Sequence, residues 1–128
     1  MHILIIEDEA LVALDLQMFL EELGAESCAV AANEEEALRE ALRQRPDFIA
    51  SDVKLGAGFG PSAVKAIRVQ LGEIPAVYIT GNPELAREAD PGVPVITKPI
   101  RWLELVEVTQ KHGLPSTGSD PVVEAGQL

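Results

Sequence analysis

Short apolar runs alternate with amphipathic segments along most of this chain. Continuous runs rich in β-branched residues are typical of strands that are covered on both faces of a sheet. Apolar positions that recur every three or four residues instead predict helices with one buried side. The predicted strands are residues 3–6, 26–30, 48–52, 74–80 and 93–98, and the predicted helices are residues 11–23, 34–45, 61–71, 84–89 and 101–111.

Residues that start or stop helices stand at several of these boundaries. Asn33, followed by Glu36 three residues later, has the pattern of a capping box at the start of a helix. Pro46 stops the same helix, because proline lacks an amide hydrogen and its ring collides with the preceding turn. Gly24 and Gly72 stand where helices commonly end, so these residues and the hydrophobic pattern predict the same boundaries.

The regular alternation of strands and helices determines the predicted fold class. Parallel strands joined by right-handed crossovers, with helices on both faces, are the usual arrangement for such an order. We therefore expect an α/β protein with a doubly wound, five-stranded parallel sheet of the flavodoxin-like (βα)5 type and the strand order 2-1-3-4-5. Residues 1–112 are expected to form this one domain. Residues 113–128 are rich in Gly, Pro, Ser and Thr without periodicity, and we expect a flexible tail there.

The charge balance narrows the classes of partner. Ten basic and 21 acidic residues give a net charge of -11, which disfavours nucleic acid and anionic membranes and favours a cationic partner or a metal ion. No apolar run approaches the roughly 18 residues of a membrane span, and no signal peptide precedes the first strand, so we expect a cytoplasmic protein. The single cysteine, Cys28, cannot form an internal disulfide and is expected to be a small core or edge residue.

Reactive side chains follow four of the five predicted strands. They are Glu7 and Asp8 after the first strand, Asp52 after the third, Thr80 after the fourth and Lys98 after the fifth. Because the carboxyl ends of parallel strands meet at one edge of a sheet, we expect three carboxylates, one hydroxyl and one ammonium to converge there.

Three clustered carboxylates repel one another and need a cation, and their hard oxygen ligands suit Mg2+. A carboxylate beside Mg2+, a lysine and a hydroxyl is equipped for phosphoryl transfer, because the cations neutralise the equatorial oxygens while the carboxylate attacks in line. The sequence therefore predicts that Asp52 is phosphorylated. Thr80 is expected to hydrogen-bond the phosphoryl group, and Lys98 is expected to pair with it.

Four motifs, taken together and in order, resemble those of the response-regulator receiver domains of two-component signalling. They are Glu7-Asp8, Asp52, Thr80-Gly81 and Lys98-Pro99. The resemblance covers residues 3–111. It implies a phosphoacceptor that takes a phosphoryl group on Asp52 from the phosphohistidine of a histidine kinase or a histidine phosphotransfer protein. Such a protein is not an enzyme in the usual sense, although it assists its own phosphorylation and dephosphorylation.

The resemblance also assigns the metal site. It implies that Mg2+ is bound directly by Asp8 and Asp52, through water by Glu7, and by the backbone carbonyl of Lys54. It further implies a cis peptide bond at Lys98-Pro99.

Signal output is expected to occur through another protein. No DNA-binding or enzymatic output segment follows the predicted domain, so we expect a stand-alone regulator, monomeric or weakly dimeric, that signals through a protein surface or serves as a phosphorelay or phosphate sink. The expected surface combines residues 84–89, 93–98 and 101–111, including Trp102. Two apolar stripes are predicted for the last helix. The stripe that faces the core consists of Ile100, Leu103 and Val106, and the adjoining stripe consists of Trp102, Leu105 and Val108.

Some positions depart from the common receiver pattern. Val95 stands where most receivers have an aromatic switch residue, three before the lysine, and Tyr78 is a candidate substitute two residues before Thr80. The glycine-rich residues 56–60 replace a frequent methionine-proline pair, and we expect a flexible loop there. Lys54 and Asn82 occupy positions at which receivers tune the lifetime of the phosphoryl group.

Two alternative functions remain open at this point. A small Mg2+-dependent phosphatase also uses an aspartyl nucleophile, but it needs a carboxylate two residues later, where this chain has Lys54. A receiver-like interaction module that is never phosphorylated usually lacks part of the site. Taken singly, each motif also has an ordinary structural explanation, such as acids at a helix start or a solvated lysine.

Overall fold

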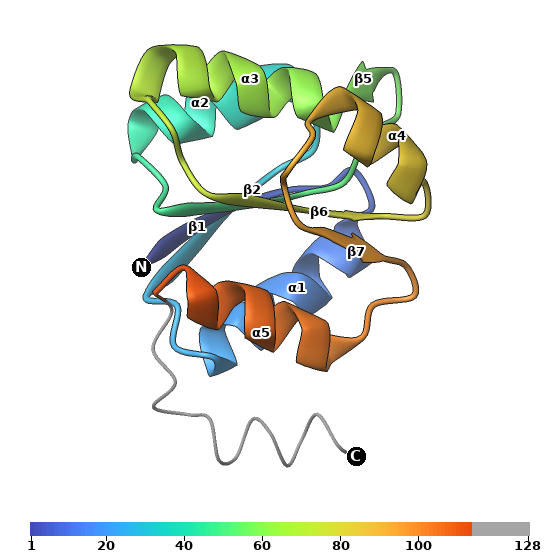
Figure 1. Ribbon diagram of the computed structural model, residues 1–128. Helices are drawn as coiled ribbons and strands as arrows, with labels where there is room; N and C mark the ends of the chain where they lie inside the picture. Colours follow the sequence, from blue (N-terminus) through green and yellow to red (C-terminus); the bar gives the residue numbers. More distant parts are fainter. Residues whose placement is uncertain (114–128) are drawn as a thin grey trace.

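A five-stranded parallel sheet lies between two layers of helices in the computed structural model, which describes residues 1–113 (Figure 1). The strands of this sheet are β1 (His2–Ile6), β2 (Ser27–Ala31), β3 (Phe48–Ser51), β6 (Ala76–Thr80) and β7 (Val95–Thr97). They are arranged in the order β2-β1-β3-β6-β7. Counted along the chain this is the predicted order 2-1-3-4-5, so the fold class is confirmed.

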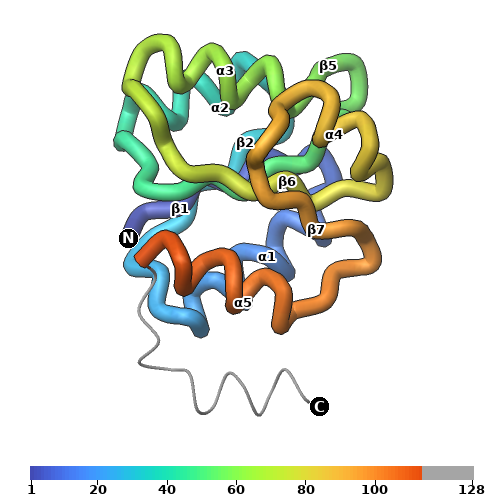
Figure 2. The backbone as a smooth tube through the Cα atoms, viewed as in Figure 1, coloured from blue at the N-terminus to red at the C-terminus, as the bar shows by residue number. Residues whose placement is uncertain are grey.

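Helices cover both faces of the sheet, as Figures 1 and 2 show. One face carries α1 (Ala10–Glu22) and α5 (Trp102–Lys111), and the other carries α2 (Glu34–Arg43), α3 (Gly60–Leu71) and α4 (Pro83–Ala89). None of the helices within residues 1–113 is long and apolar enough to span a membrane.

The central strands are mainly apolar because both of their faces are covered. Along β1, Ile3 and Ile5 belong to the core beneath α1 and α5, whereas Leu4 and Ile6 belong to the core beneath α2 and α3. All four side chains are at most 1% exposed. Full burial of an aliphatic side chain stabilises a fold by roughly 1.5–3 kcal/mol, so such strands contribute strongly to stability.

The predicted cap of α2 is present. Oδ1 of Asn33 accepts a hydrogen bond from the backbone N–H of Glu36, at 2.8 Å. The Glu36 carboxylate in turn accepts one from the backbone N–H of Ala32, at 2.9 Å, one residue earlier than in a standard capping box. Both bonds satisfy amide groups at the point where β2 gives way to the helix.

The glycine-rich segment after Asp52 differs from the prediction. Instead of a flexible loop, it forms a small antiparallel hairpin of β4 (Lys54–Leu55) and β5 (Gly58–Phe59). Gly56, in its turn, has a φ of +58°, a conformation that side chains other than glycine rarely adopt. Glycine content alone does not distinguish a tight hairpin turn from a flexible loop.

The side of α5 that faces the core also differs from the prediction. Leu105 and Val106 are buried, whereas Leu103, which was expected in the core, is 43% exposed. Trp102 packs against Phe19 of α1, with ring centroids 4.4 Å apart. Trp102 therefore lies at the junction of α1 and α5, and its part in an output surface with α4 and β7 stays a prediction. The predicted tail lies outside the described residues from position 114 onward.

Candidate functional site

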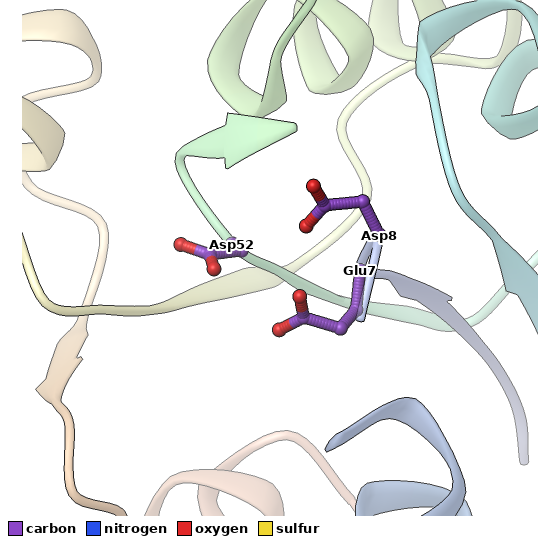
Figure 3. A group of neighbouring side chains, drawn as sticks. All are labelled: Glu7, Asp8 and Asp52. Carbon is purple, nitrogen blue, oxygen red and sulfur yellow. The ribbon is translucent and has the colours of Figure 1, made fainter. Parts of the chain in front are cut away.

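Three carboxylates meet where β1 and β3 end. Glu7 and Asp8 follow β1, Asp52 follows β3, and the two strands are direct neighbours in the sheet. Oxygen atoms of the three side chains lie within 4.8 Å of one another. Figure 3 shows the carboxylates of Glu7 and Asp8 pointing toward the side on which Asp52 lies. The structure therefore brings together the acids that the sequence singled out.

Lys98 joins two of these acids. Its ammonium nitrogen lies 2.8 Å from Oδ2 of Asp52 and 3.1 Å from Oε1 of Glu7. Its backbone N–H donates to the carbonyl of Thr80 at 2.9 Å, which fixes the residue beside the end of β6. The peptide bond between Lys98 and Pro99 is cis, as the resemblance implied.

Burial and charge pairing set the ionisation of this cluster. Burial raises the pKa of Glu7 above its ordinary value, although the backbone N–H of Glu9 and the Lys98 ammonium oppose that shift. Burial lowers the pKa of Lys98, but hydrogen bonds and charge attraction from Asp52 and Glu7 outweigh it, and the net pKa is raised. Lys98 is therefore charged at neutral pH and supplies one cation between two acids.

The other predicted site residues lie close by in the fold. Thr80 ends β6 and is fully buried, and its hydroxyl oxygen accepts a hydrogen bond from the backbone N–H of Asn82 at 3.0 Å. Lys54 begins β4, two residues after Asp52, and its side chain is exposed. The parts assigned to the Thr80 hydroxyl and to the Lys54 carbonyl stay predictions.

The backbone around Asp52 makes contacts that sequence reasoning missed. Oδ1 of Asp52 accepts a hydrogen bond from the backbone N–H of Val53, at 2.6 Å. The Ser51 hydroxyl donates to the carbonyl of Asp52, at 2.7 Å. A Cβ atom on Gly60 would lie 1.8 Å from that same carbonyl oxygen, so only glycine fits there. The one signal in the sequence was the position of Gly60 in a glycine-rich segment.

A second missed residue is Glu34 at the start of α2. Its Oε2 atom accepts a hydrogen bond from the backbone N–H of Phe59, at 2.8 Å. An acid in the first turn of a helix is common, because it complements the helix dipole. Nothing in the sequence indicated a contact with the hairpin 25 residues further along the chain.

An aspartate flanked by two acids and a lysine, at the carboxyl edge of a five-stranded doubly wound sheet, defines the receiver class of signalling domain. The family model for the response regulator receiver domain matches residues 3–110. This chain therefore belongs to the response-regulator receiver family of two-component signalling. Receiver domains are signalling phosphoacceptors rather than enzymes in the classical sense, and they interact with histidine kinases and with downstream proteins.

Three relatives illustrate the match. The phyllosphere-induced regulator PhyR of Methylorubrum extorquens AM1 is 40% identical over 85 residues, which cover 65% of this chain and 32% of the relative. The PhyR receiver domain of Erythrobacter litoralis is 27% identical with a TM-score of 0.78, and the match covers 87% of this chain and 88% of that structure. The receiver domain of the histidine kinase PA1611 of Pseudomonas aeruginosa, described with a magnesium ion coordinated in its active site cleft, is 28% identical with a TM-score of 0.74 over 86% of this chain and 94% of that structure. This chain spans about a third of the curated PhyR.

Proposed function

We propose that this protein accepts a phosphoryl group on Asp52 from a phosphohistidine donor, with Mg2+ in the acidic cluster. The observation that carries the proposal is the bridge from the Lys98 ammonium to Asp52, at 2.8 Å, beside carboxylate oxygens of Glu7 and Asp8. A negatively charged nucleophile held next to a fixed cation and a metal-binding acid pair is suited to an incoming phosphoryl group.

The donor set fits Mg2+. The carboxylates of Glu7, Asp8 and Asp52 are hard oxygen ligands within 4.8 Å of one another, and Lys98 alone does not balance their charge. The backbone carbonyl of Lys54 is proposed as a further ligand, on the strand that follows Asp52. When bound, Mg2+ supplies positive charge to the oxygens of the transferring phosphoryl group.

The proposed transfer is a simple displacement. An Asp52 carboxylate oxygen forms a bond to phosphorus while the phosphorus–nitrogen bond of the donor phosphohistidine breaks, and the imidazole leaves with the bonding electrons and takes up a proton. Lys98 then pairs with the phosphoryl oxygens instead of with the free carboxylate. The Thr80 hydroxyl, which lies at the same sheet edge, is proposed to donate a hydrogen bond to the phosphoryl group.

The surface of α1 is the proposed docking site for the donor protein. Leu11, Leu14 and Met18 are 78%, 49% and 55% exposed, and their spacing places them on one side of the helix. The helix begins two residues after Asp8, so this apolar stripe starts at the acidic cluster. Exposed apolar stripes mark protein interaction sites, and a donor helix with an apolar side would pack against this one.

Output is proposed to use the outer surface of α4, β7 and α5. Within α5, Leu103 is the large apolar residue open to solvent, whereas Trp102 is held against Phe19. The added negative charge on Asp52 would shift an existing equilibrium of this surface toward the form that a downstream protein binds.

Intact-mass measurement after incubation with Mg2+ and a small phosphodonor, such as phosphoramidate, tests the proposal. We expect the gain of one phosphoryl group, no gain in Asp52→Asn, and a normal gain in the matched control Asp15→Asn, which removes an exposed α1 carboxylate. Absence of uptake with any donor would favour the unphosphorylated interaction module. Steady hydrolysis of phosphomonoesters would favour the phosphatase.

A further inference from the structure

Glu34 connects the start of α2 to the hairpin that follows Asp52. It is the first residue of α2, and its Oε2 atom accepts a hydrogen bond from the backbone N–H of Phe59, at 2.8 Å. A Cβ atom on the neighbouring Gly58 would lie 3.1 Å from the same oxygen, so the carboxylate lies directly against the hairpin backbone. The contact joins β5 to the start of α2.

The hairpin reaches from the phosphoacceptor to the second metal-binding acid. Its first strand begins two residues after Asp52, and the backbone N–H of Gly60 closes its base on the carbonyl of Val53, at 2.6 Å. At its tip, a Cβ atom on Gly56 would lie 3.7 Å from Oδ2 of Asp8, so the turn lies beside that carboxylate. The position of the hairpin therefore sets where the backbone of Lys54 lies relative to the acids.

We propose that Glu34 is a positioning residue for the Mg2+ site. Two strands of two residues each are too short to hold a fixed position by their own pairing. The bond from Phe59 to Glu34 supplies an anchor on a rigid helix, and it holds the Lys54 backbone at the acidic cluster. This inference rests on the proposed function, because it concerns the same metal site.

A purely electrostatic effect of Glu34 would look similar in a single mutant, since any nearby acid attracts a cation. Glutamine separates the two effects, because its amide oxygen can accept the Phe59 hydrogen bond without carrying charge. Alanine removes both the bond and the charge. Glu35, the next residue, is the matched control, because its side chain is 88% exposed and it too is an acid in the first turn of α2.

The experiment is Mg2+ titration by calorimetry of the full chain and its Glu34→Ala, Glu34→Gln and Glu35→Ala variants, with hydrogen exchange at the Phe59 amide. We expect Glu34→Ala to weaken Mg2+ binding about tenfold, as loss of an outer-shell partner commonly does, and to speed exchange at Phe59. Glu34→Gln and Glu35→Ala should bind Mg2+ within about twofold of the natural chain, with Phe59 still protected, since one retains the acceptor and the other retains Glu34.

Several results would overturn the inference. If Glu34→Gln binds Mg2+ as weakly as Glu34→Ala, the effect is one of charge and not of position. If Glu34→Ala binds as tightly as Glu35→Ala, or keeps Phe59 protected, the anchor is absent. Phosphoryl uptake by the natural chain, with any of these results, leaves the proposed function intact, whereas a natural chain that binds no Mg2+ overturns both.

Discussion

The phenolic hydroxyl of Tyr78 donates a hydrogen bond to Oδ2 of Asp90, at 2.8 Å, inside the α3–α4 layer. The guanidinium of Arg68 binds the same oxygen at 2.9 Å. Tyr78 belongs to β6, Arg68 to α3, and Asp90 is the C-cap residue directly after α4. Burial, and then the hydrogen bond and the charge of Asp90, raise the pKa of Tyr78, so its hydroxyl remains a donor throughout the ordinary pH range.

Tyr78→Phe tests what this bond contributes to stability. The ring stays buried, but Asp90 loses one donor and keeps Arg68, so we expect the free energy of unfolding to fall by about 1–2 kcal/mol. Urea denaturation measures the change. In an Asp90→Asn background the same substitution should cost less, because the bond to a charged acceptor is already lost. Equal costs in both backgrounds would contradict an energetic role for the pair.

Tyr78 also lies beside the position at which this chain departs from the common receiver pattern. Tyr78 and Val95 are register partners on β6 and β7. The sequence suggested Tyr78 as the substitute for the aromatic residue missing at Val95, and the structure gives Tyr78 no exposed surface. The role of Tyr78 as a substitute switch residue stays a prediction.

Lys98→Met should change how stability depends on pH. In metal-free protein Glu7 would lose its cation while it remained buried, so its folded-state pKa would rise further above the unfolded value. Between those two values the folded state binds more protons than the unfolded state, and stability therefore falls as pH rises. We expect a steeper loss of stability than in the natural chain as pH rises through this window.

Urea denaturation in the presence of a chelator, from about pH 4.5 to 8, a range that begins near the ordinary pKa of Glu, measures this effect. The matched control is Lys111→Met, which removes an exposed lysine from α5. Adding Glu7→Gln to Lys98→Met should flatten the profile again, because the buried acid that lost its cation is then absent. A profile parallel to that of the natural chain would show that Lys98 does not hold Glu7 ionised.

Cys28 should react slowly with alkylating reagents. Burial, with a smaller contribution from the charge of Glu21, raises the pKa of its thiol to about 11. The thiolate is the reactive form, so at pH 8 the rate with iodoacetamide should be about 200-fold below that of an unperturbed thiol. It should increase about tenfold per pH unit up to about pH 10. The urea-unfolded chain is the control, and equal rates in the folded and unfolded states would refute the prediction.

The fold and the acidic cluster were predictable because they depend on patterns that repeat along the chain. Continuous apolar strands separated by helices imply a covered parallel sheet, and such a sheet brings its strand ends to one edge. Glu7, Asp52 and Lys98 therefore meet although 91 residues separate the first from the last.

The remaining features depend on contacts between side chains and backbone that no local pattern encodes. The bond from Phe59 to Glu34 joins a hairpin to a helix that precedes it by 25 residues. The prediction of which side of α5 is buried was wrong. Leu103 and Leu105 are both apolar, and packing against the rest of the core decides which of them is buried. Such choices follow from the three-dimensional arrangement of the layers, not from spacing along one element.

Gly60→Ala should be severely destabilising, although alanine ordinarily favours a helix over glycine by about 1 kcal/mol. The added Cβ would lie 1.8 Å from the carbonyl oxygen of Asp52 and 2.6 Å from the Ser51 hydroxyl. The nearest group is backbone and cannot rotate away, so either α3 or the backbone of Asp52 must move. Overpacking of this kind costs about 1–3 kcal/mol or more.

Gly81→Ala is the matched control, because no atom lies within 4 Å of its added Cβ, and its stability should change by less than about 0.5 kcal/mol. Urea denaturation of both variants measures the difference, and a Gly60→Ala protein as stable as Gly81→Ala would mean that the start of α3 does not approach Asp52 this closely.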